Sequence, residues 1–201
     1  MTARDTPEIC GDATPSRERR QMLQGAIGAA LGSMWPGVAR AQDADPRNAR
    51  PREGDRFVFA GGDRKGAIVM ARDLTLGGPP ASAYPQEPTS GITRDGSRLN
   101  QVLLIRLDVA ELTEATRPRA PEGIVAYSAI CTHTGCDSWA WQGDEKLLKC
   151  PSHDSEFVAR DGARVTSGPA PRRLATLPLK IVDGVVIAAD VFVGRVGFQP
   201  G

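Results

Sequence analysis

The chain has 201 residues, of which 40% are hydrophobic and 24% are charged, and this fits one globular domain better than a multidomain enzyme. Its 25 Lys and Arg residues nearly balance its 24 Asp and Glu residues, so no net basic field is available to hold nucleic acid. Only two histidines are present, which excludes any mechanism that needs three.

The N-terminal segment has the features of an export signal. A twin-arginine pair, Arg19 and Arg20, precedes a weakly hydrophobic, glycine-rich run, and a small-x-small cleavage site follows at residues 39–41. These features predict a twin-arginine signal peptide over residues 1–41 and a periplasmic mature protein. The alternative is an uncleaved membrane anchor, although a membrane-spanning helix needs roughly 20 mostly apolar residues and Gly and Pro interrupt this run.

The next segment, residues 42–56, is polar and rich in Arg, Asp and Pro, and it predicts a linker with little structure. Short apolar runs bounded by turn residues then predict a β domain over residues 57–201. We expect strands at residues 57–60, 66–70, 101–107, 124–130, 146–149, 157–159, 177–182 and 185–189.

Asp183 and Gly184 stand between the last two runs and are a strong hairpin signal. A Gly- and Pro-rich stretch, residues 77–100, predicts a long loop, and one helical turn is expected near residues 109–116. The fold class is therefore predicted to be all-β, an antiparallel barrel or sandwich.

Both histidines fall in short motifs that also contain cysteine. Cys131 and His133 form a C-x-H motif, and Cys150 and His153 form a C-x-x-H motif further along the chain. Two thiolates and two imidazoles can bind one tetrahedral zinc ion in a structural module. They can also bind a [2Fe-2S] cluster in which one iron has two Cys ligands and the other has two His ligands. The mixed spacing favours the cluster, because structural zinc sites usually pair Cys with Cys and His with His along the chain.

The motifs resemble those of the Rieske iron–sulfur proteins. In that family the first box is C-T-H-x-G-C and the second is C-P-x-H-x-S, and here they stand at residues 131–136 and 150–155. The sequence S-G-P-A-P at residues 167–171 is similar to the proline-containing loop that covers the cluster in the family. The resemblance implies the Rieske fold, with a cluster-binding subdomain at about residues 127–172.

The resemblance also implies one Rieske-type [2Fe-2S] cluster and assigns residues to it. Cys131 and Cys150 would bind one iron, and His133 and His153 would bind the other. The positions that would lie close to the cluster without binding iron are Gly135, Ser155 and Pro169.

Two positions depart from the high-potential members of the family. Those proteins carry a disulfide between the two boxes, for which Cys136 supplies one partner here, whereas Ser152 stands at the other position. They also carry a Tyr that donates a hydrogen bond to a ligand sulfur, and Phe157 stands there. Because hydrogen bonds to the sulfurs stabilise the reduced cluster, the resemblance implies a lower reduction potential than in a disulfide-bearing relative.

Three short stretches are similar to one branch of the family, the small subunit of arsenite oxidase: residues 84–85, 153–157 and 193–195. This similarity implies an electron-transfer subunit whose partners are a molybdopterin large subunit and a c-type cytochrome acceptor. The alternative is the Rieske subunit of a quinol-oxidising cytochrome bc-type complex. Both histidines are used by the cluster, so none remains for the mononuclear iron of a ring-hydroxylating oxygenase. The sequence shows no complete active site of its own and leaves open whether the protein is an enzyme.

Overall fold

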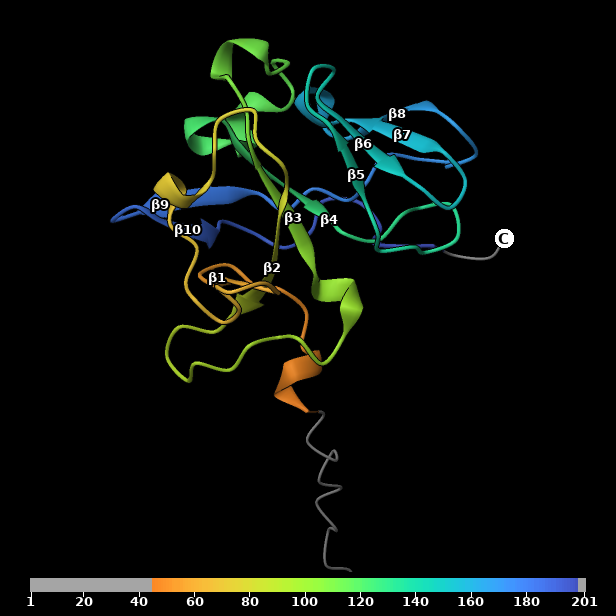
Figure 1. Ribbon diagram of the computed structural model, residues 1–201. Coiled ribbons are helices and arrows are strands. Elements are labelled where there is room, and N and C mark those ends of the chain that lie inside the picture. The colour runs from red at the N-terminus through yellow and green to blue at the C-terminus, as the bar shows by residue number, and fades with distance from the viewer. Residues whose placement is uncertain (1–44, 199–201) are drawn as a thin grey trace, which may run out of the picture. The chain divides into compact units, whose positions relative to one another are not determined.

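The computed structural model describes residues 45–198, which form two antiparallel sheets and contain no α-helix (Figure 1). This confirms the all-β prediction. The segment predicted to be a signal peptide, residues 1–41, lies outside the described residues. Within the described part of the chain, no helix is long and apolar enough to cross a membrane.

The larger sheet has six strands in the order β4-β3-β2-β1-β10-β9. Its strands are β1 (Arg56–Phe59), β2 (Ala81–Gln86), β3 (Val102–Arg106), β4 (Ile124–Ser128), β9 (Leu179–Val182) and β10 (Val185–Ala188). The segment that leads into the edge strand β9 pairs with the other edge strand, β4, because Ser128 N–H donates to Ala175 O at 2.8 Å and Leu177 N–H donates to Ala126 O at 2.9 Å. The sheet therefore curls into a barrel-like body, as the sequence predicts.

The smaller sheet has four strands in the order β5-β6-β7-β8 and lies between β4 and β9 in the sequence. Its strands are β5 (Ala140–Gln142), β6 (Leu147–Cys150), β7 (Ser155–Val158) and β8 (Arg164–Ser167). It forms the separate lobe at the upper right of Figure 1. The Tyr127 hydroxyl of β4 donates to Ala159 O at 2.6 Å, which ties this lobe to the larger sheet.

Strand β3 separates two hydrophobic cores. Leu103 and Ile105 belong to the core that also contains both cysteines of the motifs, whereas Val102 and Leu104 belong to the core inside the larger sheet. Successive side chains of a strand point to opposite faces, so a strand with a core on each side is a continuous apolar run. The sequence V-L-L-I of β3 is such a run.

Short 3-10 turns connect the strands. They lie at Pro46–Asn48, Ala71–Asp73, Arg98–Asn100, Val109–Glu111, Arg117–Arg119, Pro121–Gly123 and Ala159–Asp161. The turn at Val109–Glu111 falls inside the stretch predicted to hold one helical turn. The predicted hairpin between β9 and β10 is confirmed: Asp183 and Gly184 both have positive φ, 51° and 77°, as a two-residue type I′ turn requires.

The prediction of a long loop over residues 77–100 is wrong in part, because this stretch contains β2. A proline inside a strand argues against a ladder position, since it has no N–H to donate. Here Pro85 pairs with Phe57 of β1, and β3 pairs with residues 81–83 alone. Pro85 therefore lies beyond the part of β2 that pairs with β3, and on that side its carbonyl accepts from Arg94 N–H at 2.8 Å.

Two further predictions differ from the structure. Residues 66–70 make isolated bridges to β1 and β10 and do not form a regular strand. The described part of the predicted linker is held in place, because Asp55 forms a buried ion pair with Arg94, with Nε to Oδ2 at 2.6 Å. The partner lies 39 residues away, so local composition could not show this contact.

Candidate metal centre

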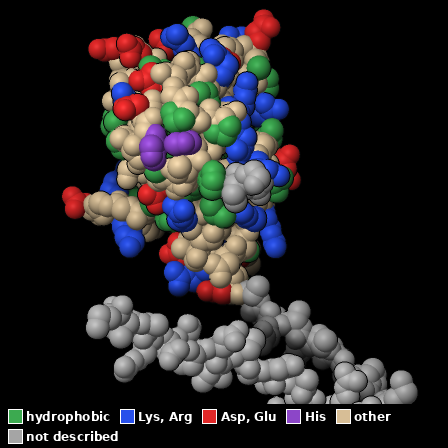
Figure 2. Space-filling view, turned by 90° about the vertical axis from the view of Figure 1, so that its right-hand side faces the viewer, with side chains coloured by type: hydrophobic (Ala, Val, Ile, Leu, Met, Phe, Trp, Pro, Cys, Tyr) green, Lys and Arg blue, Asp and Glu red, His purple; other side chains and the backbone are tan. Residues whose placement is uncertain are grey.

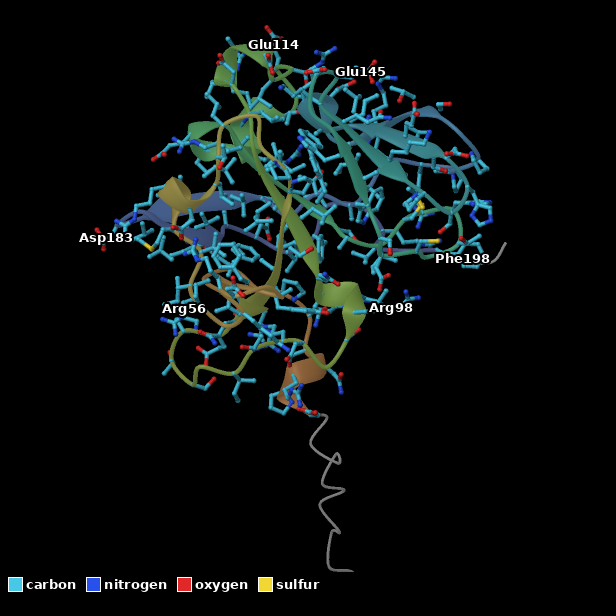
Figure 3. All side chains as sticks on the ribbon, viewed as in Figure 1. Arg56, Arg98, Glu114, Glu145, Asp183 and Phe198 are labelled. Carbon is cyan, nitrogen blue, oxygen red and sulfur yellow. The ribbon has the colours of Figure 1, made fainter. Side chains whose placement is uncertain are left out.

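The two motifs lie in loops at one end of the smaller lobe. Residues 131–136 follow β4, and residues 150–155 form the hairpin that joins β6 to β7. The ladder pairs Cys150 with Ser155, so the second motif is bounded by hydrogen-bonded strands on both sides. Figure 3 shows sulfur atoms, in yellow, grouped on the right-hand side above the labelled Phe198.

A tight backbone turn shapes the first motif. Cys131 N–H donates to Cys136 O at 2.8 Å, and Gly135 N–H donates to Cys131 O at 3.1 Å. Gly135 has a φ of 83°, a left-handed conformation that glycine adopts without strain. Arg98 supports the turn from outside, because its Nη1 donates to Gly135 O at 2.7 Å. Gly135 thus lies at the site and contributes to it through its backbone conformation and its two backbone hydrogen bonds.

The two cysteines form the buried side of the site. Cys131 is 0% exposed and Cys150 is 1% exposed. Burial raises the pKa of the Cys131 thiol to about 11; a backbone N–H at His133 opposes the rise and the neighbouring Cys150 thiol adds to it. Two buried thiolates side by side need positive charge between them, which a metal centre supplies on binding.

The two histidines form the outer side of the site. Their ring centroids are 4.6 Å apart with an interplanar angle of 86°, and His153 is exposed while His133 is partly buried. Nδ1 of His133 is buried and has no hydrogen-bond partner, which is costly unless the atom has another ligand. Figure 2 shows the two rings side by side on the surface, surrounded by uncharged atoms, with acidic and basic side chains further out.

The four side chains divide into a thiol pair and an imidazole pair. Among residues 45–198, no three His, Cys, Asp or Glu side chains are grouped as ligands of a single metal ion. A binuclear group whose two irons carry different ligands suits this division, and the orphaned His133 nitrogen and the apposed thiols fit its donor set. The residues of the two sequence motifs therefore lie together in the structure.

The proline-containing loop packs tightly against the second motif. A Cβ on Gly168 would lie 2.5 Å from Ser155 Cα, and the φ of Gly168 is +82°, so only glycine allows this approach. Ala170 N–H donates to the buried Oγ of Ser155 at 3.2 Å, which leaves the hydroxyl hydrogen of Ser155 available for a nearby sulfur. Pro169 is exposed at the tip of this loop.

A second contact joins this loop to the first motif, because Thr132 Oγ1 donates to Arg172 O at 2.6 Å. Sequence reasoning did not identify Arg98, Thr132 or Gly168 as supports of the site. The contacts of Arg98 and Thr132 span 37 and 40 residues, so no local pattern could have revealed them.

Two aromatic side chains, Phe157 and Trp139, pack in the core of the smaller lobe next to the cysteines. Phe157 is 0% exposed and meets Trp139 edge to face, with ring centroids 5.5 Å apart. Trp139 Nε1 donates to Ala129 O at 2.7 Å, which fixes the indole beneath the first motif. Phe157 lies in the same core as Cys131 and Cys150, so it is part of the wall that separates the thiols from the rest of the lobe.

The third cysteine of the lobe, Cys136, is a free thiol, as are Cys131 and Cys150. Hydrogen bonds from the Ser152 and Thr134 hydroxyls lower the pKa of Cys136, with Ser152 the larger cause. The two boxes are therefore linked at this position by a hydroxyl–thiol contact where a disulfide would require a second cysteine.

Comparison with known proteins identifies the family that these residues resemble. Residues 101–178 match the model of the Rieske [2Fe-2S] domain. The chain is 35% identical over 104 residues to the cytochrome bc1 complex Rieske iron–sulfur subunit of Mycobacterium tuberculosis, covering 49% of this chain and 24% of the relative. It is 39% identical over 83 residues to the subunit of the same name from Streptomyces lividans, covering 41% of this chain and 49% of the relative. The chain thus spans a quarter to a half of these relatives' length.

Among solved structures, the ferredoxin of carbazole 1,9a-dioxygenase from Nocardioides aromaticivorans IC177 aligns with a TM-score of 0.41 at 17% identity. The alignment covers 61% of this chain and 93% of the ferredoxin.

Proposed function

Since residues 101–178 are a Rieske [2Fe-2S] domain and its cofactor is one Rieske-type [2Fe-2S] cluster, we propose that this electron-transfer protein is a subunit of a quinol-oxidising complex of the cytochrome bc type. Both sequence relatives described above are cytochrome bc1 complex subunits. They support this alternative over the small subunit of arsenite oxidase, for which the sequence offers only short stretches of similarity. Its partners would then be a cytochrome b and a c-type cytochrome.

The proposed ligands are the two residue pairs of the motifs. Cys131 and Cys150 would hold one iron from the buried side, and His133 and His153 would hold the other from the surface. The support for this assignment is the pairing itself: apposed thiols that are almost fully buried, and imidazole rings 4.6 Å apart at the surface. The same pairing supports an iron–sulfur cluster over the structural zinc module that the motifs alone left open.

The observation that carries the proposed function is the position of the imidazole pair. When bound, the cluster supplies one-electron redox chemistry. The side chain of His153 is exposed, so the hydroxyl of a quinol can approach the ring and donate a hydrogen bond to it. The uncharged surroundings in Figure 2 suit an apolar quinol ring or the face of a partner subunit.

The remaining residues of the site hold this arrangement rigid. The buried cysteines, Leu148 and Phe157 exclude water from the inner side. A backbone N–H at His133 donates to the Cys131 sulfur, and the Ser155 hydroxyl keeps its hydrogen free to donate; donors to sulfur tune the potential. Thr132 and Gly168 keep the proline-containing loop against both motifs, so the outer rings stay fixed while a partner docks.

We also propose that residues 1–41 direct export by the twin-arginine pathway. The support is the twin-arginine pair and the small-x-small sequence that follows the apolar run. A periplasmic location is compatible with a quinol-oxidising partner at the outer face of a cytoplasmic membrane.

Mild-detergent purification of the tagged full-length protein from its own organism tests the function. We expect haem b and haem c absorption bands to co-purify with the Rieske electron paramagnetic resonance signal. A Cys150→Ser variant that lacks the cluster serves as the spectroscopic baseline. Stoichiometric molybdenum without haem b would overturn the proposal in favour of a molybdopterin partner.

A further inference from the structure

A cavity of about 190 Å³ is lined in part by Arg172 and Arg173, which directly follow the proline-containing loop, and its lining includes none of the motif residues. Three segments far apart in the sequence form most of its wall: residues 115–119, 172–176 and 193–195. Val125 and the buried Leu174 supply part of its apolar lining. The function proposed above does not use this cavity.

Four arginines line the cavity, and no Asp or Glu lines it. They come from all three segments: Arg119, Arg172, Arg173 and Arg195. Arg119, Arg173 and Arg195 are exposed, so solvent screens part of the repulsion among them, and Arg172 is partly buried. In the part of the chain that the structure describes, none of the four has a carboxylate oxygen within 4.0 Å.

Among residues 45–198, the twelve arginines outside the cavity divide evenly between those with and those without an ion pair. Six of them form ion pairs with Asp or Glu, namely Arg47, Arg64, Arg94, Arg98, Arg106 and Arg164. The nearest acidic side chain in sequence to the cavity wall at Gly162 is Asp161, and it is already paired with Arg164 at 2.6 Å. The feature that distinguishes the cavity is therefore that four unpaired arginines from three segments lie together around one space.

Arg172 anchors the wall between the cavity and the metal centre. Its Nη2 donates to Gly197 O, and its carbonyl accepts the hydrogen bond from Thr132. Its Nε is buried and has no partner. A buried guanidinium N–H without an acceptor is costly, so this atom is a second sign that an acceptor is missing from the region.

We propose that this cavity binds a small phosphate-type oxyanion, either free or as the phosphate group of a small ester. Several guanidinium groups that approach from different segments suit an anion with three or four oxygens, because each can donate charge-assisted hydrogen bonds. At roughly 30 Å³ for each water in the liquid, the cavity has room for about six water molecules. This space is large enough for phosphate with a short organic group.

Isothermal titration calorimetry on the cluster-loaded full chain tests the proposal, with inorganic phosphate and glycerol 3-phosphate as probes in a buffer of low ionic strength. We expect saturable binding with one site per chain. Tighter binding of glycerol 3-phosphate would assign the site to small phosphate esters, and binding of inorganic phosphate alone would assign it to the free ion.

The double variant Arg173→Gln/Arg195→Gln should weaken binding by about a hundredfold, since each lost charged donor accounts for about tenfold. The matched control is Arg72→Gln, which removes an exposed arginine outside the cavity and should leave binding unchanged. An unaltered cluster spectrum in each variant verifies folding, and Arg119→Gln is the substitute if the double variant misfolds. Absence of saturable heat with both probes, or equal binding by the double variant and the control, would overturn the proposal.

Discussion

Replacing Phe157 with Tyr should raise the reduction potential of the cluster. Phe157 and Ser155 point to the same face of β7, and their ladder partners Leu148 and Cys150 point to that face on β6. A hydroxyl added to the ring of Phe157 therefore enters the core that holds both cysteines. If it donates to a sulfur, it stabilises the more negative reduced form and the potential rises.

The size of the rise follows from hydrogen-bond energies. A hydrogen bond to a charged group contributes about 1.5–3 kcal/mol, and only the part that is stronger in the reduced form moves the potential. With ~1 kcal/mol of difference, and 1.4 kcal/mol corresponding to about 59 mV for one electron, the expected rise is about 40 mV. A hydroxyl that finds no acceptor would instead destabilise the fold by about 1–3 kcal/mol, because Phe157 is 0% exposed.

Protein-film voltammetry on both forms, together with denaturant unfolding, measures the two effects separately. The matched control is Phe57→Tyr, because Phe57 is equally buried but belongs to the core inside the larger sheet. The control should lose stability and keep its potential. An unmoved or lower potential in the Phe157→Tyr variant would show that the hydroxyl does not reach a ligand sulfur, and would refute the reasoning.

Three further predictions address the ligands, the export signal and the proline-containing loop. Replacing His153 with Ala should abolish the Rieske electron paramagnetic resonance signal of the reduced protein, and an unchanged signal would remove His153 from the ligand set. Changing Arg19 and Arg20 to Lys should leave the precursor in the cytoplasm on cell fractionation; normal periplasmic accumulation would contradict the export proposal. Gly168→Ala should destabilise the fold by about 2–4 kcal/mol in thermal or denaturant unfolding, because its Cβ would meet backbone at 2.5 Å with φ at +82°. Its control is Gly61→Ala, where nothing lies within 4 Å, and equal stability of the two variants would argue against the close approach.

The strands that follow simple patterns could be predicted from the sequence. Apolar runs bounded by turn residues correspond to β1, β3, β4, β6, β7, β9 and β10. The strands that were not predicted are β2, β5 and β8, whose sequences are A-S-A-Y-P-Q, A-W-Q and R-V-T-S. Their side chains are mostly partly buried or exposed, so they are short of the apolar residues on which strand prediction depends.

The sequence alone indicates the metal-binding chemistry of the site. Cys and His side chains are metal ligands, and within each motif they lie only two or three residues apart. Their burial, pairing and support were decided by the tertiary structure. The contacts of Arg98 with Gly135, of Thr132 with Arg172 and of Gly168 with Ser155 join segments 13 to 40 residues apart. The arginine-lined cavity likewise exists only where three separate segments meet. The sequence shows which metal-ligating and hydrogen-bonding side chains the chain contains. The distances between such side chains from different segments depend on how the two sheets pack.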